Sequence, residues 1–279
     1  MKKSTVILLI ISAVLIVTGI IFCIVGSAKA KVDGSQLFRQ IKNSDGNLVE
    51  TIDLSEEILN KIKINVPEAK INVYGNSDKA YVEIVNFNAL DYTAYINNRA
   101  LIIENDLVAA MVNRVSGGDI GYNGLRDYFR IIKTNDKKEI NIYLTNKNEV
   151  KIFDFNVGEG DLVFDSVANI SDYNITLANG NVMFKNIAEV SKISAKIESG
   201  NVELNSLFAN VGVIEIGSGN LTLSSPKDMT YTYDLTAEMG EITVGNESYK
   251  GSHKHENEES DGSITANIEV GNIKIKFDE

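Results

Sequence analysis

The stretches Glu198-Ser-Gly-Asn-Val-Glu-Leu204 and Gly217-Ser-Gly-Asn-Leu-Thr-Leu223 contain the sequence unit that decides the fold. Six glycines in the second half of the chain are each followed by Asn, Asp or Glu and align as a repeat, namely Gly160, Gly180, Gly200, Gly219, Gly240 and Gly271. The intervals between these glycines are 20, 20, 19, 21 and 31 residues. Such a regular period is typical of repeat proteins, in which each unit stacks on its neighbours.

Apolar residues recur at fixed positions around each glycine. The residues five and three positions before it, and two and four positions after it, are apolar in every unit; around Gly200 they are Ala195, Ile197, Val202 and Leu204. Alternation of apolar and polar residues indicates strands with one buried face. The alternation changes parity at the glycine, so the chain turns there and keeps the same face inside. Each unit is predicted to be strand, corner, strand.

Such units form either the rungs of a β-solenoid, with equivalent strands in parallel, or hairpins of an antiparallel sandwich. In a hairpin the residue before each glycine would face the core. Four of these six residues are polar, namely Glu159, Asn179, Ser199 and Ser218, and only Met239 and Val270 are apolar. The near-constant unit length also favours stacked rungs. We therefore predict an all-β fold with a β-solenoid of about 20-residue rungs. The polar run within 249–263 is interpreted as a loop between rungs.

The chain divides into four segments. Residues 1–31 are predicted to form an N-terminal membrane anchor, 32–60 a linker, 61–150 an N-terminal β region of the ectodomain, and 151–279 the repeat β-solenoid. Alternating apolar residues support the β region from Ile62 onward. The glycine-rich residues 116–124 match neither a Walker loop nor a dinucleotide-binding fingerprint, so we interpret them as a surface loop.

The predicted anchor is a single transmembrane helix. Residues 6–25 carry no charge, and twenty residues of helix span about 30 Å, the thickness of a bilayer core. Lys2 and Lys3 place the short N-terminus in the cytoplasm and the C-terminal domain outside the cell. The alternative is a secretory signal that is cleaved after Ala30. Cys23, the one cysteine, lies within the apolar segment, so the ectodomain must fold without disulfides.

The composition excludes several classes of protein. The 279 residues include only two Pro and no Trp, and 44% are apolar, which argues against collagen-like and wholly disordered chains. The net charge is −11, from 27 basic and 38 acidic residues. The first 31 residues contain four of the lysines and no acid, so the remainder is still more acidic. An acidic body argues against a nucleic-acid partner.

The strands Ile64-Asn-Val66, Ile71-Asn-Val73 and Ile140-Asn-Ile-Tyr-Leu144, followed by the serial Ser-Gly-Asn rungs, resemble the bacterial "putative adhesin" family, domain of unknown function 4097. The resemblance covers about residues 60 to 279. It implies a β-solenoid-like surface domain, often membrane-anchored and sometimes encoded with envelope-stress signalling systems. It implies no established reaction and no catalytic residues.

Two groups of residues are candidates for chemistry. Asp161, Asp165 and Asp172 could meet as a carboxylate pair for polysaccharide cleavage, but acids at turns are usually solvated. His253 and His255 stand near Glu258, Glu259 and Asp261 and could hold a metal, although a mobile loop would not fix its geometry. We therefore predict no catalytic, cofactor-binding or metal site.

The expected function is that of a non-enzymatic, single-pass cell-membrane protein with an extracellular domain, either an adhesin or an envelope-stress accessory protein. Its expected partners are the membrane and a cell-wall or surface-protein component. The alternative is an extracytoplasmic enzyme that acts on polysaccharide from a β-helix scaffold.

Overall fold

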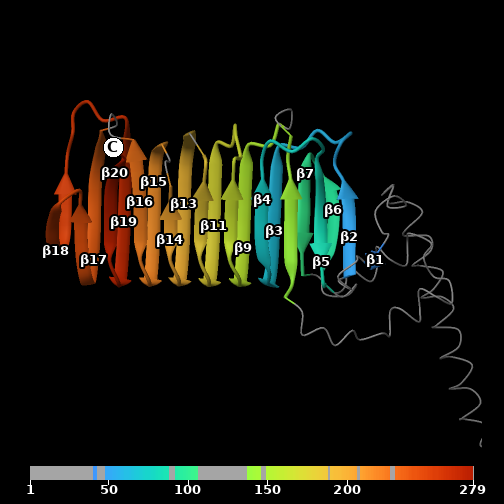
Figure 1. Ribbon diagram of the computed structural model, residues 1–279, viewed down its shortest axis with the longest axis horizontal. Helices are drawn as coiled ribbons and strands as arrows, with labels where there is room; N and C mark the ends of the chain where they lie inside the picture. The colour runs from blue at the N-terminus through green and yellow to red at the C-terminus, as the bar shows by residue number, and fades with distance from the viewer. Residues whose placement is uncertain are drawn as a thin grey trace, which may run out of the picture.

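The strands of this protein lie side by side in one elongated stack (Figure 1). The computed structural model describes residues 40–42, 48–87, 92–105, 137–145, 149–187, 189–205, 208–226 and 230–278. The predicted anchor, residues 1–31, and the predicted surface loop, residues 116–124, lie outside the described residues. Within the part that is described, no helix has the length and hydropathy to cross a bilayer.

Each predicted repeat forms a long strand, a corner and a short strand. The long strands pair in parallel in the order β9 (Ile152–Glu159), β11 (Asp172–Asn179), β13 (Glu189–Ser199) and β15 (Phe208–Ser218). The short strands follow the same order, as β10 (Leu162–Asp165), β12 (Val182–Lys185), β14 (Val202–Leu204) and β16 (Leu221–Pro226). Equivalent residues stack directly, so Leu177 pairs with Val157 on one side and Ile197 on the other. The prediction of parallel solenoid rungs is confirmed, and the hairpin sandwich is excluded.

The last two rungs do not stack in chain order. Strands β19 (Gly262–Val270) and β20 (Ile273–Asp278) pair with β15 and β16 on one side and with β17 (Tyr231–Val244) on the other. The final residues of the chain therefore fill a rung between two earlier ones. The rung of Gly240 thus lies at the C-terminal end of the stack.

The predicted loop within 249–263 is wrong over much of its length. Glu247–His255 form strand β18, which pairs antiparallel with β17 and covers the end of the stack (Figure 1). Only Tyr249 and His253 of this strand are half-buried; its other side chains are exposed. An end strand needs few apolar residues, because it has stacked neighbours on one side only. Its sequence therefore lacks the alternation by which the other strands are predicted.

A further rung precedes the glycine repeats. Strands β3 (Lys61–Glu68) and β4 (Lys70–Tyr74) pair in parallel with β9 and β10, and Ala69 stands at the corner between them. Beyond this rung, β7 (Ala100–Glu104) pairs with β3, and β8 (Glu139–Tyr143) pairs with β4. The solenoid thus begins within the predicted N-terminal β region.

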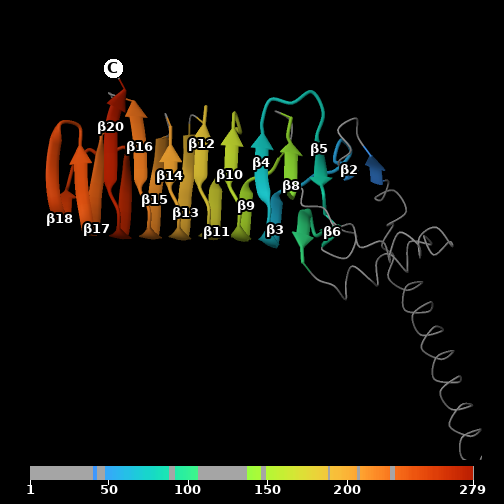
Figure 2. The same cartoon turned by 60° about the horizontal axis from the view of Figure 1, so that its bottom comes forward.

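Antiparallel strands close the N-terminal end of the stack. Strand β6 (Thr93–Asn97) pairs with β7, β5 (Tyr81–Val85) with β8, β2 (Leu48–Asp53) with β5, and β1 (Gln40–Lys42) with β2 (Figure 2). The predicted linker, 32–60, is wrong for this stretch, because Ile52, Leu54 and Leu59 are buried. Three buried apolar side chains spread over eight residues are too few for a clear periodic signal.

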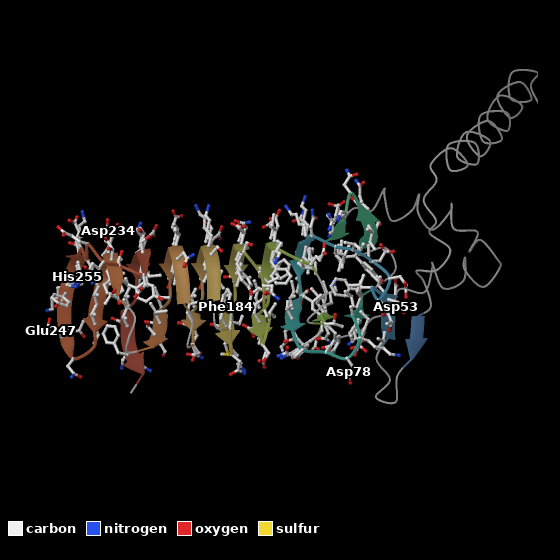
Figure 3. The ribbon with its side chains drawn as sticks, turned by 90° about the horizontal axis from the view of Figure 1, so that it is seen from above. Asp53, Asp78, Phe184, Asp234, Glu247 and His255 are labelled. Carbon is white, nitrogen blue, oxygen red and sulfur yellow. The ribbon has the colours of Figure 1, made fainter. Side chains whose placement is uncertain are left out.

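The interior contains one continuous apolar core. Inward-facing residues of every rung contribute to it, and an aromatic cluster fills its middle. Phe164 lies at the centre of this cluster, with ring centroids 4.8 Å from Phe184 and 5.1 Å from Tyr173. Figure 3 shows Phe184 in the middle of the stack. Each large apolar side chain of this core contributes about 1.5–3 kcal/mol when it leaves water, so burial of the core is the main source of stability.

The residues after the corner glycines form a ladder of hydrogen bonds. The backbone N–H and side-chain amide of Asn201 both donate to Oδ1 of Asn181, at 3.1 and 3.0 Å. Oδ1 of Asn201 in turn accepts from the N–H and amide of Asn220, at 3.0 and 2.9 Å. The ladder begins at Asp161 and ends at the backbone N–H of Glu241. Asn is required inside it because each side chain must both donate and accept.

Replacing Asn201 with Ala is expected to lower the free energy of unfolding by about 1–2 kcal/mol, because side-chain bonds to both neighbouring rungs are lost. Asp161→Asn is the matched control. Asp161 accepts from Asn181 through one oxygen, and an amide keeps such an oxygen, so a change below about 0.5 kcal/mol is expected. Urea unfolding of the full chain in detergent, followed by circular dichroism, measures both. Equal losses in the two variants would contradict the ladder's role.

Tyr173 carries a buried hydroxyl that has no hydrogen-bond partner among the described residues. Tyr173→Phe is expected to raise the free energy of unfolding by about 1 kcal/mol, because the unpaired hydroxyl is removed from an apolar site. Tyr95→Phe is expected to lower the free energy of unfolding instead, since the Tyr95 hydroxyl donates a hydrogen bond to Glu104 at 2.7 Å. Urea unfolding at neutral pH measures both, and a destabilised Tyr173→Phe variant would show that the hydroxyl is satisfied.

The difference in the free energy of unfolding between Tyr173→Phe and the wild type is also expected to grow at alkaline pH. Burial raises the pKa of Tyr173 above its ordinary value of 10.0. A raised pKa in the folded state gives stability that is complete below pH 10 and falls as the pH rises, because the unfolded chain ionises first. Burial likewise raises the pKa of Tyr233 to about 12, so the wild type should weaken from pH 10 upward. Unfolding measured between pH 9 and pH 11 tests this; parallel curves for variant and wild type would contradict it.

Candidate functional site

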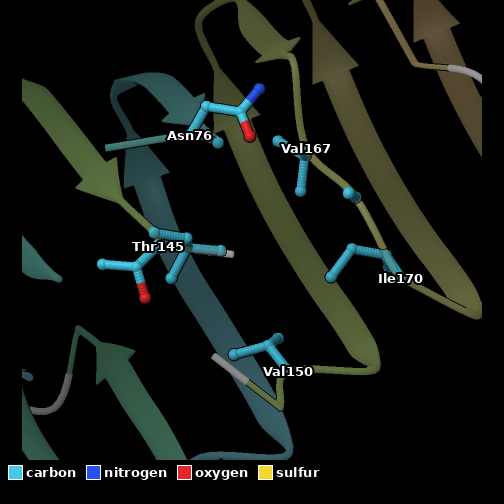
Figure 4. Close-up of a pocket in the computed structure, with 8 residues that line it drawn as sticks. Asn76, Thr145, Val150, Val167 and Ile170 are labelled. Atoms are coloured by element: carbon cyan, nitrogen blue, oxygen red, sulfur yellow. The ribbon is translucent and has the colours of Figure 1, made fainter. Parts of the chain in front are cut away.

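The enclosed space near the N-terminal rungs is too small for a ligand. A cavity of about 10 Å³ lies between Gly75, Leu144, Val150 and Ile170 (Figure 4). This volume is about that of one water molecule. The interior at this point is therefore packed and holds no ligand-sized space.

A shallow groove crosses the outer face of the long strands near the C-terminal end. Its volume is about 640 Å³, and it runs over β13, β15, β19 and β17. The register places Glu198 beside Gly217, Gly217 beside Glu269, and Glu269 beside Glu238. Gly217 has no side chain, so the surface is lowered between two carboxylates.

The groove is mainly acidic. Glu198, Glu215, Glu238 and Glu269 line it and are exposed, while its one lysine, Lys196, lies 3.5 Å from Glu215. Asn267 and Thr236 add neutral polar groups. Exposed carboxylates attract cationic groups, and salt screens that attraction over about 8 Å at physiological ionic strength. The groove therefore suits a cationic or polar partner.

A second feature is a stack of three tyrosines on the outer face near the N-terminal end. The ring of Tyr143 lies 5.2 Å from Tyr74 and 4.3 Å from Tyr81, with interplanar angles of 23° and 15°. Burial, and then the charge of Glu83, raise the pKa of Tyr143, so its hydroxyl is neutral at physiological pH. The rings cover one another, so the stack presents mainly ring edges and hydroxyls. This cluster was not predicted; its signal in the sequence is a tyrosine at the end of β4, at the start of β5 and at the end of β8.

The aspartates considered for polysaccharide cleavage have structural partners. Asp161 accepts two hydrogen bonds from Asn181, each of 2.9 Å, at the start of the ladder. Asp165 accepts from Ser166 at 2.8 Å and from Asn186 at 3.0 Å. Asp172 is the first residue of β11. The carboxylates of Asp161 and Asp165 thus hold neighbouring corners and turns.

The two histidines lie on strand β18 rather than in a loop. The ring of His253 stacks on Tyr249, with centroids 3.8 Å apart at 20°. His255 lies 6.3 Å from the ring of Tyr233. Across the described part of the chain, no three His, Cys, Asp or Glu side chains are arranged to hold a metal ion. The pairing of His253 with an aromatic ring indicates a packing role for that imidazole.

The solved structures that match this chain share little sequence with it. A structure described as a "putative cell adhesion protein" from Clostridium sporogenes is 19% identical, with a TM-score of 0.45, and the match covers 83% of this chain and 99% of that one. A structure described as a "putative adhesin" from Bacteroides fragilis is 16% identical, with a TM-score of 0.39, and covers 81% and 96% respectively. No curated protein matches this chain.

A family model matches the sequence of the whole described solenoid. The Toastrack model, domain of unknown function 4097, matches residues 59–278. This span begins just before β3 and ends with β20, so it contains all the parallel rungs. The chain belongs to the Toastrack (DUF4097) family.

Proposed function

We propose that this chain is a membrane-anchored bacterial cell-surface protein that acts by adhesive contact and catalyses no reaction. The observation that carries this proposal is the distribution of polar groups over the stack. The rungs bury a continuous apolar core, whereas the groove acids and the tyrosine hydroxyls lie on outer faces. A long, rigid body with an acidic face is suited to binding other surface components.

The direction of the stack supports a tethered arrangement. Strand β1 lies at one end and β18 at the other, so the chain enters the stack at the end opposite to β18 (Figure 1). A tether formed by the preceding residues would carry the solenoid with its C-terminal end outermost. The uncharged residues 6–25 have the length and hydropathy that such a tether requires.

Protease treatment of intact bacteria that express the full chain with a C-terminal epitope tests location. We expect the epitope to stay with the cells and to be removed by external protease, while a cytoplasmic control protein survives. Release of the epitope into the medium would show that residues 1–31 are a cleaved signal instead of an anchor. An epitope that is degraded only after lysis would contradict the proposal.

The acidic groove also favours one second candidate, an enzyme that acts on polysaccharide. Glycosidases use two carboxylates across a bound sugar, and Glu198 and Glu269 flank the lowered surface at Gly217. The purified full chain is expected to release no reducing ends from cell-wall polysaccharide. Turnover that is lost in both Glu198→Gln and Glu269→Gln would establish the enzyme and overturn the non-catalytic proposal.

A further inference from the structure

We propose that two copies of this chain pair with each other through strand β18, edge to edge and antiparallel, about a twofold axis at Gly251. The interface lies at the C-terminal end of the stack, where Glu247 and His255 mark the two ends of the strand (Figure 3). This pairing goes beyond the proposed cell-surface function and does not depend on an anchor.

Strand β18 is the longest edge in the described part of the molecule. It has nine residues and pairs only with β17 there, whereas the edges β6 and β1 have five and three residues. An edge strand presents unpaired N–H and C=O groups that can continue a sheet into another chain. The outer edge of β18 therefore offers a row of backbone partners.

The shape of β18 restricts what can pair with it. Ser252 pairs with Thr236 on the long arm of the last rung, while Lys250 pairs with Glu241 on its short arm. The strand therefore turns the corner at Gly251, which has a φ of 79°. A strand that pairs along this edge must have its own bend opposite Gly251. Two identical antiparallel strands meet this condition only when Gly251 of one copy lies opposite Gly251 of the other.

The side chains select the same register independently. With Gly251 on the twofold axis, the opposed pairs are Glu247 with His255, Ser248 with Lys254, Tyr249 with His253, and Lys250 with Ser252. A shift of two positions either way would set Lys250 opposite Lys250 or opposite Lys254. Like charges directly opposite are destabilising. A shift of one position would set the core-facing side of one strand against the outer side of the other.

The two half-buried side chains of β18 lie next to the proposed twofold axis. The stacked rings of Tyr249 and His253 close the end of the core. In the pair, these rings would lie opposite the same two rings of the second copy, and four rings would meet at the twofold axis.

Lysines on an edge strand often prevent such pairing. In the proposed register, each lysine of β18 faces a serine of the second copy instead of another charge. Lys254 also has its own counter-ion, Glu256, at 2.7 Å. The charges that would protect a monomeric edge therefore do not oppose this particular arrangement.

Disulfide trapping tests the register. In the full chain with Cys23→Ser, the double variant Ser248→Cys/Lys254→Cys is expected to form a covalent dimer under mild oxidation. The two positions of one chain are six residues apart, roughly 20 Å along an extended strand. Even around a corner they lie beyond the roughly 7 Å that a disulfide can span. Either single variant should therefore form little covalent dimer, because its thiol faces no thiol in the second copy. Trapping of the double variant that is no more efficient than that of the single variants would overturn the proposal.

A charge exchange tests the pairing without cysteines. Ser248→Lys sets a lysine opposite Lys254 at two symmetric places, and we expect it to weaken dimerisation roughly tenfold. Ser248→Lys/Lys254→Glu should restore the dimer, because opposite charges then face each other. The mass of the detergent-solubilised full chain, measured by light scattering over a dilution series, reports both. A monomeric wild type, or a double variant that stays as weak as Ser248→Lys, would overturn the proposal. A wild-type edge that instead binds a strand of another protein would also appear as a monomer here.

This test and the location test are independent. A dimer in a chain that proves cytoplasmic would retain the pairing and reject the cell-surface function. A surface-exposed chain that is monomeric would retain the cell-surface function and reject the pairing. If both hold, copies tethered at their N-terminal ends would meet through their outermost ends.

Discussion

Gly200→Ala is expected to lower the free energy of unfolding by more than about 4 kcal/mol, or to prevent the C-terminal rungs from folding. A Cβ atom at this position would lie 1.6 Å from the carbonyl oxygen of Gly180, well inside contact distance. The obstacle is backbone, which cannot rotate away as a side chain can. Gly200 also has a φ of 148°, which L-residues rarely adopt.

The same contact recurs along the corner of the stack, so the effect should not be relieved by a local shift. Each corner glycine packs against the carbonyl of the corner beneath it, with a notional Cβ contact of 1.6 to 1.9 Å. Moving one corner to admit a methyl group would move every corner above it. Urea unfolding of the full chain in detergent, followed by circular dichroism, measures the loss.

Gly251→Ala is the matched control for backbone conformation alone. Gly251 also has a positive φ, of 79°, but nothing lies within 4 Å of its notional Cβ. Its replacement should cost only about 1–2 kcal/mol, the usual price of a left-handed L-residue. Equal losses at Gly200 and Gly251 would show that φ, and not the close stacking of corners, explains the recurring glycine.

The repeat was predictable because packing constrains each rung in the same way. The corner glycine is fixed by the corner beneath it, the following Asn by the ladder, and the flanking apolar residues by the core. Each constraint requires one type of residue at a fixed position in every rung, so the sequence repeats with a regular spacing. Six such units in phase were enough to predict parallel stacking.

The first rung escaped prediction because one of these constraints is missing there. Its corner is Ala69, and the strands on its far side, β7 and β8, come from separate stretches of chain. No corner of the described chain lies beneath Ala69, so a methyl group is tolerated. A repeat that is recognised by its corner glycines therefore begins one rung after the first rung of the solenoid.

The order of the last rungs could not be read from the sequence for a different reason. Strands β17 and β19 carry the same alternation, so either could stack on β15. The choice depends on β18, whose polar side chains give no periodic signal. The groove has the same origin, because Glu198, Glu269 and Glu238 become neighbours only through this inserted rung.

Phe164→Ala is expected to lower the free energy of unfolding by about 3–5 kcal/mol, because a cavity would open in the aromatic cluster. The Phe164 ring lies within 5.7 Å of Phe153, Phe155, Tyr173 and Phe184, measured between ring centroids, and is fully buried. Phe277→Ala is the control, because that ring is 40% exposed and its removal should cost less than about 1.5 kcal/mol. The same urea unfolding measures both variants.

The way in which Phe164→Ala unfolds carries a second consequence. Each rung contacts only its neighbours, so stability in a solenoid is close to a sum of rung and interface terms. Strand β10, which contains Phe164, lies between β4 and β12. Weakening this rung should therefore let the two ends of the stack unfold independently of each other. Hydrogen exchange should then be faster in β9 to β12 than in β19 and β20. Uniform acceleration along the whole chain would show that the stack unfolds as one cooperative unit, and the additive description would then not apply to this solenoid.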